Sequence, residues 1–211
     1  MSVRDIQIFP FVGLLKIHGG MYSTEIYNNN EWTAGPYLPK PFIQACVTQL
    51  NTTHTIITGG YTCERCTFLL DWTKSNPRWM KMASMKHGRR DHACISLPQG
   101  ELMVANGHYL RSVEIYNPLQ NVWRKGVSTP FTRYLGSIVL IKNSTPMIVG
   151  GVNEEGFFET RLYVLKDSSW IQLDIKLDAS WKYRPYHYHY HFGFVSTMIP
   201  IPLLPNCTKI S

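Results

Sequence analysis

Residues 84–126 read SMKHGRRDHACISLPQGELMVANGHYLRSVEIYNPLQNVWRKG and contain, in order, the signals that decide the fold. An arginine-bearing turn leads into a short apolar run, which ends at the turn of residues 98–100. A second apolar run ends at Gly107, and two further short runs lie on either side of a Tyr-Asn-Pro turn, the last one holding Trp123. Short runs rich in Ile, Val and Tyr that are divided by Gly, Pro and Asn predict β-strands.

The same signals recur along the chain in the same order. Four tryptophans are spaced 47, 44 and 47 residues apart, namely Trp32, Trp79, Trp123 and Trp170. An apolar run that ends in two glycines, or once in Asn-Gly, precedes each tryptophan, at residues 19–20, 59–60, 106–107 and 150–151. A period of 40 to 50 residues predicts a propeller or another array of repeats. We expect the four tryptophans to be buried between repeats, each covering on the order of 150–250 Å².

Each of three units predicts four strands. They are residues 43–50, 54–58, 67–71 and 79–82; residues 92–97, 101–105, 112–116 and 122–125; and residues 136–141, 147–149, 161–165 and 170–173. A fourth unit, at the start of the chain, shows no clear inner strand. A four-stranded sheet cannot bury both faces alone, and stacking such sheets radially around an axis solves this problem.

At these residues the chain resembles the kelch-repeat family. The resemblance covers about residues 14–173 and is strongest in residues 84–126. It implies an all-β fold, a kelch-type β-propeller with four-stranded blades that serves as a protein-binding platform. Two departures concern loops only: Asn106 replaces the first glycine of its pair, and Tyr163-Val164 replaces the usual Tyr-Asp turn.

The count of blades is a larger departure, because kelch propellers commonly have more, usually six. We predict one domain over residues 1–211, with repeats at about 14–38, 41–85, 89–127 and 133–175 and a partial inner strand at 191–199. That strand either begins an uncompleted blade or pairs with residues 14–18 and closes the ring. The first interpretation, an incomplete propeller, is preferred. Its open blade edges would allow association with another chain.

The amino-acid composition argues against several classes of function. Lys plus Arg number 21 and Asp plus Glu number 14, a net charge of +7, but the basic residues do not form the continuous stripe typical of nucleic-acid binders. The sequence contains no run of 18 apolar residues, so no membrane-spanning helix is predicted. Five cysteines cannot all pair, so a reducing, cytoplasmic location is expected. Three N-glycosylation sequons, at Asn51, Asn143 and Asn206, are weak contrary evidence.

Signals for catalysis or metal binding are weak. Cys63 and Cys66 have the spacing of half a zinc site or of a redox pair, but no second pair exists, so an exposed loop with unpaired thiols is preferred. Three alternating histidines, His187, His189 and His191, would share one face of a strand and could bind a metal, although a polar loop is preferred. His92 is expected to pack inside a blade. No metal and no cofactor is predicted.

The expected function is binding of a partner protein. The loops after the glycine pairs and those before the inner strands are expected on the two rims of the propeller, where loops vary over a rigid scaffold. The kelch resemblance implies partner-binding roles for Tyr61, Arg90, His108 and Arg133. An alternative is that the arginines bind carbonyl groups between blades.

The prediction is therefore a non-catalytic scaffold for a protein or acidic peptide, with ubiquitin-ligase substrate recognition or cytoskeletal assembly as the roles implied by the resemblance. The alternative is a metal-dependent, oxidase-like propeller enzyme, because some kelch-like propellers belong to copper oxidases.

Overall fold

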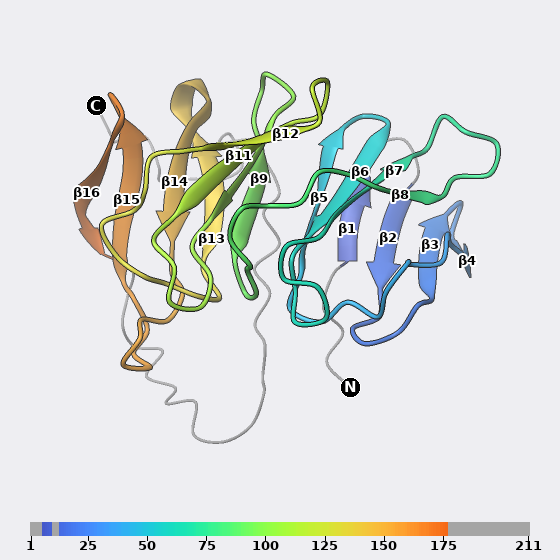
Figure 1. Cartoon of the computed structure of the whole chain (residues 1–211), viewed down its shortest axis with the longest axis horizontal. Coiled ribbons are helices and arrows are strands. Elements are labelled where there is room, and N and C mark those ends of the chain that lie inside the picture. Colours follow the sequence, from blue (N-terminus) through green and yellow to red (C-terminus); the bar gives the residue numbers. More distant parts are fainter. Residues whose placement is uncertain (1–5, 10–12, 177–211) are drawn as a thin grey trace.

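A computed structural model describes residues 6–9 and 13–176 of the chain. They form four antiparallel sheets, each of four strands connected in sequence order (Figure 1). Blade I contains β1 (Ile6–Phe9), β2 (Gly13–Ile17), β3 (Thr24–Asn28) and β4 (Glu31–Ala34), and blade II contains β5 (Cys46–Asn51), β6 (His54–Thr58), β7 (Thr67–Asp71) and β8 (Trp79–Lys81). Blade III contains β9 (Ala93–Ser96), β10 (Leu102–Ala105), β11 (Val113–Asn117) and β12 (Val122–Lys125). Blade IV contains β13 (Ser137–Ile141), a 3₁₀ turn η1 (Lys142–Ser144), β14 (Thr145–Val149), β15 (Arg161–Lys166) and β16 (Ser169–Lys176).

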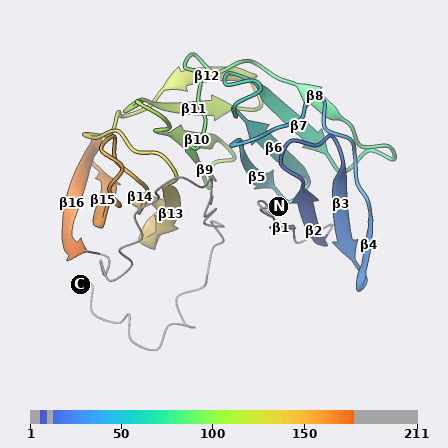
Figure 2. The same cartoon turned by 90° about the horizontal axis from the view of Figure 1, so that it is seen from below.

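The four blades form an arc around a common axis. In Figure 2 the first strand of every blade, β1, β5, β9 or β13, lies on the concave side, and the fourth strand lies on the convex side. This arrangement confirms the predicted all-β propeller architecture. It also shows an inner strand in blade I, β1, where the sequence predicts none.

Three apolar cores lie between successive blades. Side chains of blades I and II form the first, those of blades II and III the second, and those of blades III and IV the third. The runs of β6, β7 and β10 are almost wholly buried because apolar neighbours cover both faces of the sheet. Stacking of the sheets, not the individual sheet, therefore supplies the core.

Two of the tryptophans connect their blade to the chain segment that precedes it. Trp123 pairs with Tyr116 across β11 and β12, and its indole Nε1 donates a hydrogen bond of 2.9 Å to the carbonyl oxygen of Ala83 on the segment from blade II. Trp170 makes the equivalent bond of 2.8 Å to Val127. Trp79 and Trp123 are buried, as predicted, and Trp170 is half-buried. Trp32 is 41% exposed, so its predicted burial is wrong, because no blade precedes blade I among the described residues.

Three inner strands start later than predicted. β5 begins at Cys46, not at residue 43, β9 at Ala93, not at 92, and β13 at Ser137, not at 136. Two residues before each of them the backbone is left-handed, with φ 60° at Gln44, 49° at Asp91 and 57° at Leu135. Such residues rarely continue a strand, so each segment turns sharply before the strand starts.

Some predictions fall outside the described residues, including the partial strand at 191–199 and the histidines His187, His189 and His191. Within residues 6–9 and 13–176, no helix has the length and apolar character that a membrane span needs.

Candidate functional site

The loops after the second strands and the segments before the first strands meet at one rim. The glycine loops of blades I, II and III each donate a backbone hydrogen bond to the next blade: Gly20 to the oxygen of Phe42 at 2.8 Å, Gly60 to that of Arg89 at 2.8 Å and Gly107 to that of Arg133 at 3.0 Å. The prediction that the two kinds of loop occupy two rims is therefore wrong. They come together because an antiparallel four-stranded blade returns the chain to the same end after strands two and four.

Arg133, predicted to face a partner, is instead 2% exposed. Its guanidinium lies 4.1 Å from the ring centroid of Phe131 and donates a hydrogen bond of 2.9 Å to the carbonyl oxygen of Gly150. Glu159 balances the charge at 3.8 Å. Burial lowers the pKa of Arg133 to about 10, which leaves it charged at neutral pH. Arg133 is a structural residue that binds carbonyl groups, but these belong to Gly150 and Arg161 of its own blade, not to a neighbouring blade as the alternative expects.

Arg89 has the same structural role in blade III. It is 1% exposed, and it donates hydrogen bonds to the carbonyl oxygens of Asn106 at 2.7 Å and Ser112 at 2.8 Å and to the carboxylate of Glu114 at 2.9 Å. Burial would raise the pKa of Glu114, but hydrogen bonds from the Lys86 backbone and from Arg89 lower it overall. The Arg89–Glu114 ion pair therefore holds in place the chain segment that leads to the rim.

Polar side chains gather where the segments of blades II, III and IV meet; we call Gln44, Asp91, His108 and Tyr134 the rim cluster. Asp91 is buried, and its Oδ2 accepts a hydrogen bond of 2.8 Å from the Gln44 amide and lies 3.1 Å from His108 Nε2. The ring of His108 stacks on that of Tyr134, with centroids 4.3 Å apart and an interplanar angle of 17°. Ring stacking and the contact with Asp91 thus hold a half-exposed imidazole in one orientation.

The backbone fixes the spacing within the rim cluster. Asp91 N–H donates to the carbonyl oxygen of Gln44 at 3.0 Å, and Leu135 N–H donates to that of Asp91 at 2.8 Å. Leu135 has φ 57°, like the left-handed Gln44 and Asp91 at the same position of their blades. These bonds join three blades at the point where the side chains converge. Burial, with the neighbouring Tyr109 and Asp91, raises the pKa of Tyr134, so its hydroxyl keeps its proton at neutral pH.

A cation and an aromatic ring lie on the same rim. Arg90 directly precedes Asp91, and its guanidinium carbon is 5.5 Å from the ring centroid of Tyr61. Tyr61 is 64% exposed. Whereas Arg89 and Arg133 are paired with buried glutamates, the part of the chain that the structure describes offers Arg90 no carboxylate partner. Arg90 is therefore suited to receive an external anion.

The sequence therefore places three residues on this rim, Tyr61, Arg90 and His108, and misses Gln44, Asp91 and Tyr134. Asp91 and Tyr134 directly follow an arginine of the repeat, Arg90 or Arg133, whereas Gln44 follows Ile43 and carries no such signal. That spacing was the available signal, but only the stacked blades show that Asp91 and Tyr134 both contact His108.

The cysteines differ from the prediction of unpaired thiols. Cys46 and Cys94 form a disulfide between blades II and III, and Cys63 and Cys66 form a second one within a loop. The first pair is brought together by the packing of β5 on β9, which the linear sequence does not reveal. Cys207 lies outside the described residues.

The donor set for copper can be tested on the described residues. Nowhere in residues 6–9 and 13–176 do three His, Cys, Asp or Glu side chains group so that they could hold a metal ion. The rim cluster offers one imidazole and one carboxylate, and the latter is engaged by Gln44. These residues do not fit a copper centre, and we derive no step through one.

Comparison with known proteins relates this geometry to enzymes. N-acetylneuraminate epimerase 2 of Escherichia coli O6:H1 is 28% identical over 148 residues, which cover 64% of this chain and 40% of that protein. N-acetylneuraminate epimerase of Escherichia coli strain K12 is 28% identical over 116 residues, covering 49% of this chain and 32% of its own length. The chain thus spans less than half of the curated relatives it matches. No protein-family profile matches the chain.

Two solved structures share the fold. The structure titled "Structure of YjhT" superposes with a TM-score of 0.59 at 19% identity, covering 67% of this chain and 54% of that one. The described residues form four blades of a kelch-type β-propeller. The second structure, a fungal alcohol oxidase of the AA5 family in complex with copper, has a TM-score of 0.59 at 14% identity and covers 72% of this chain and 37% of that one.

These comparisons contradict the predicted function. The sequence predicts a non-catalytic scaffold or substrate adaptor, but the named relatives by sequence are enzymes, N-acetylneuraminate epimerases. The prediction failed because a propeller rim that binds a protein and one that binds a small substrate use the same residue types, Tyr, Arg and His. The alternative of a propeller enzyme agrees better with the relatives.

Proposed function

We propose that this propeller rim is the site of an enzyme that epimerises an acidic sugar of the N-acetylneuraminate class. The observation that carries the proposal is the Asp91–His108 contact of 3.1 Å on the segment where Asp91 directly follows Arg90, whose guanidinium lies over Tyr61. The names of the curated relatives supply the substrate class. We also propose that the individual repeats of this chain are kelch repeats.

Recognition of the substrate falls to Arg90 and Tyr61. An acidic sugar has a carboxylate, and a guanidinium can bind both of its oxygens. The stacked ring of Tyr61 restricts the Arg90 side chain, so less conformational entropy is lost on binding. The exposed face of Tyr61 can contact the apolar face of a sugar ring.

Proton transfer falls to His108 and Tyr134. An epimerase inverts one stereocentre and needs groups that take a proton and return one. When His108 Nε2–H donates to Asp91, the lone pair of Nδ1 is free to take a proton from the substrate. Asp91 then stabilises the imidazolium that forms. The Tyr134 hydroxyl, whose pKa is raised, remains protonated and can act as the donor.

The test measures the interconversion of the epimers of N-acetylneuraminate by NMR, with the purified chain and with variants. We expect His108→Gln to lower kcat by about 100-fold or more, and Arg90→Gln to act mainly by raising KM. Arg124→Gln is the control, because this exposed arginine pairs with Glu101 away from the rim cluster. An interconversion rate equal to that without protein, or a His108→Gln rate equal to that of the wild type, would refute the proposal.

A further inference from the structure

The proposed reaction leaves the C-x-x-C loop unexplained. Cys63 and Cys66 are disulfide-bonded, with Cα atoms 5.4 Å apart, on the loop between β6 and β7. Cys63 is half-buried and Cys66 is 6% exposed, so Cys63 is the more accessible of the two residues. Two backbone hydrogen bonds, from Cys63 to the oxygen of Gly60 at 3.1 Å and from Cys66 to that of Cys63 at 2.9 Å, fold the loop into successive turns.

The two residues inside the disulfide hold the chain that enters blade III. Arg65 exchanges a pair of hydrogen bonds with Met85: its Nε donates to the Met85 oxygen at 2.7 Å, and Met85 N–H donates to the Arg65 oxygen at 2.9 Å. Arg89 N–H donates to the oxygen of Glu64 at 2.7 Å. A Cβ at Gly88 would lie 2.9 Å from Glu64 Oε2, which shows how closely the two segments approach.

The held segment leads directly to the rim cluster. Arg90 and Asp91 follow Arg89 in the sequence, and the Arg89 carbonyl also accepts the hydrogen bond from Gly60. Tyr61, on the same loop as the disulfide, carries the ring below Arg90. A change in the conformation of residues 63–66 would therefore affect the positions of both Arg90 and Tyr61.

We propose that Cys63–Cys66 is a site of reversible thiol–disulfide exchange that controls the position of Arg90 and Asp91. A thiolate of a small or protein dithiol attacks the more accessible sulfur, Cys63, and the Cys63–Cys66 bond breaks, releasing the Cys66 thiolate. The second thiol of the reductant then displaces Cys63, so two cysteine thiols form here and one disulfide forms in the reductant. An oxidised dithiol reverses the reaction. Only the effect on sugar binding rests on the proposed function.

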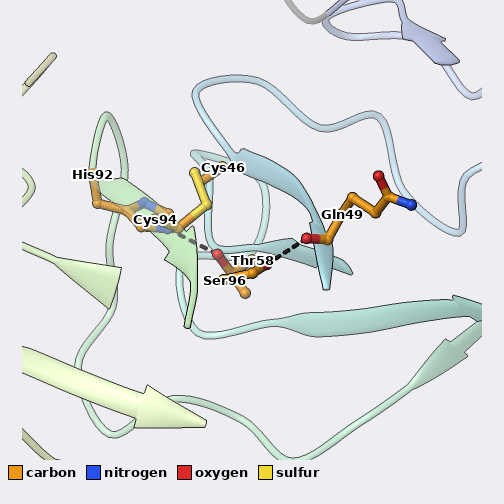
Figure 3. Close-up of a disulfide and its surroundings, with 6 residues drawn as sticks. All are labelled: Cys46, Gln49, Thr58, His92, Cys94 and Ser96. Carbon is orange, nitrogen blue, oxygen red and sulfur yellow. Dashed lines mark hydrogen bonds between the residues drawn. A yellow bond between two sulfur atoms is a disulfide. The ribbon is translucent and has the colours of Figure 1, made fainter. Parts of the chain in front are cut away.

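The other disulfide provides an internal reference. Figure 3 shows Cys46–Cys94 between β5 and β9, beside the Ser96 hydroxyl that donates to the carbonyl oxygen of Gln49 and the His92–Thr58 contact of 2.9 Å. Cys46 and Cys94 are 48 residues apart and belong to different blades, whereas Cys63 and Cys66 are 3 apart within one loop. Several contacts thus hold the Cys46–Cys94 sulfurs together, so this bond should resist reduction longer.

The test titrates the full chain with mixtures of reduced and oxidised dithiothreitol, then measures differential alkylation of each cysteine by peptide mass spectrometry. Amide hydrogen exchange of residues 85–91 is measured on the same samples. We expect Cys63 and Cys66 to become alkylated while Cys46 and Cys94 remain oxidised, and exchange in residues 85–91 to accelerate about fivefold or more.

Two variants complete the test. Cys63→Ala with Cys66→Ala should show the fast exchange under all conditions, and Cys46→Ala with Cys94→Ala should keep its redox sensitivity. If a variant fails to fold, the titration of the wild type still decides. The inference is wrong if Cys46–Cys94 is reduced at the same or a milder ratio, or if exchange in residues 85–91 ignores the redox state.

Binding of N-acetylneuraminate is measured in both redox states as a separate readout. We expect the affinity to fall about fivefold or more on reduction. Absence of binding in both states, with the alkylation and exchange results as expected, would refute the proposed function and leave the exchange site standing. Sugar binding that is equal in both states, with unchanged exchange, would refute the exchange site alone.

Discussion

Arg89 and Glu114 form a buried ion pair of 2.9 Å in blade III, and in blade II the two equivalent positions hold Phe42 and Phe68. Phe42 and Arg89 each lie four residues before an inner strand, and both accept a hydrogen bond from a glycine of the preceding blade. The phenylalanine rings meet edge-on, with centroids 5.8 Å apart. One structural position is thus filled either by an ion pair or by an apolar pair.

This equivalence predicts the result of exchanging the pair. Glu114→Gln should destabilise the fold by about 3–5 kcal/mol, because the charge of Arg89 stays buried without its partner. Arg89→Phe combined with Glu114→Phe should cost less than Glu114→Gln, because no buried charge remains. Denaturant titration measures both free energies of unfolding. A double variant less stable than Glu114→Gln would contradict the equivalence.

The buried His92 predicts how stability depends on pH. Burial, with the charge of Arg89, lowers the pKa of His92 to about 3 from 6.5. As the pH falls below about 6.5, His92 therefore binds a proton in the unfolded chain but not in the native state. The contribution of neutral His92 to the free energy of unfolding is thus fully present above pH 6.5 and is lost as the pH falls toward 3. The expected loss is about 1.4 kcal/mol per pH unit.

Unfolding titrations at pH 6.5 and pH 5 measure this effect. The wild type should lose about 2 kcal/mol over that interval, and His92→Gln should lose much less. An unchanged slope in His92→Gln would show that another group causes the pH dependence.

The tryptophans predict a contrast between two equivalent positions. Trp123 is 8% exposed and Trp32 is 41% exposed, although both pair with a tyrosine across the outer two strands. Trp123→Ala should cost about 3–5 kcal/mol. Trp32→Ala should cost clearly less, since much of its ring is already in water. Equal losses in denaturant titration would contradict the assignment of Trp123 to the core between blades.

Gly60 and Gly100 allow the cost of a steric clash to be separated from the cost of a left-handed backbone. A Cβ at Gly60 (φ 96°) would lie 2.7 Å from the carbonyl oxygen of Ile43, whereas Gly100 (φ 81°) has no atom within 4 Å of its ideal Cβ. Gly100→Ala should cost about 1–2 kcal/mol for its left-handed backbone. Gly60→Ala adds a clash and should cost about 2–5 kcal/mol. Thermal unfolding of both variants measures the difference, and similar losses would argue against the close approach at the rim.

The local parts of the fold could be predicted because their signals are short in range. Short apolar runs next to turn residues mark β6 and β7, whose bounds match the predicted residues 54–58 and 67–71. The starts of the inner strands are harder to predict, because β5 and β13 follow left-handed residues, Gln44 and Leu135, whose types do not signal such a turn. Tyr61 and His108 were found on the rim because they directly follow the glycine loops.

What the sequence by itself determined is the repeat, and with it the all-β propeller of four-stranded blades, since strand periodicity and turn residues act within one unit. Only the tertiary structure decided which side chains meet: Asp91 with His108, Cys46 with Cys94, and Arg133 buried instead of exposed. Cys46 and Cys94 belong to different blades and meet through the stacking of whole sheets, which a pattern confined to a single repeat does not specify. Asp91 with His108, and Arg133 with Gly150, come from the segment before the first strand and the loop after the second strand of one blade. They meet because the antiparallel blade returns the chain to the same rim, and a linear pattern does not show which side chains face each other there.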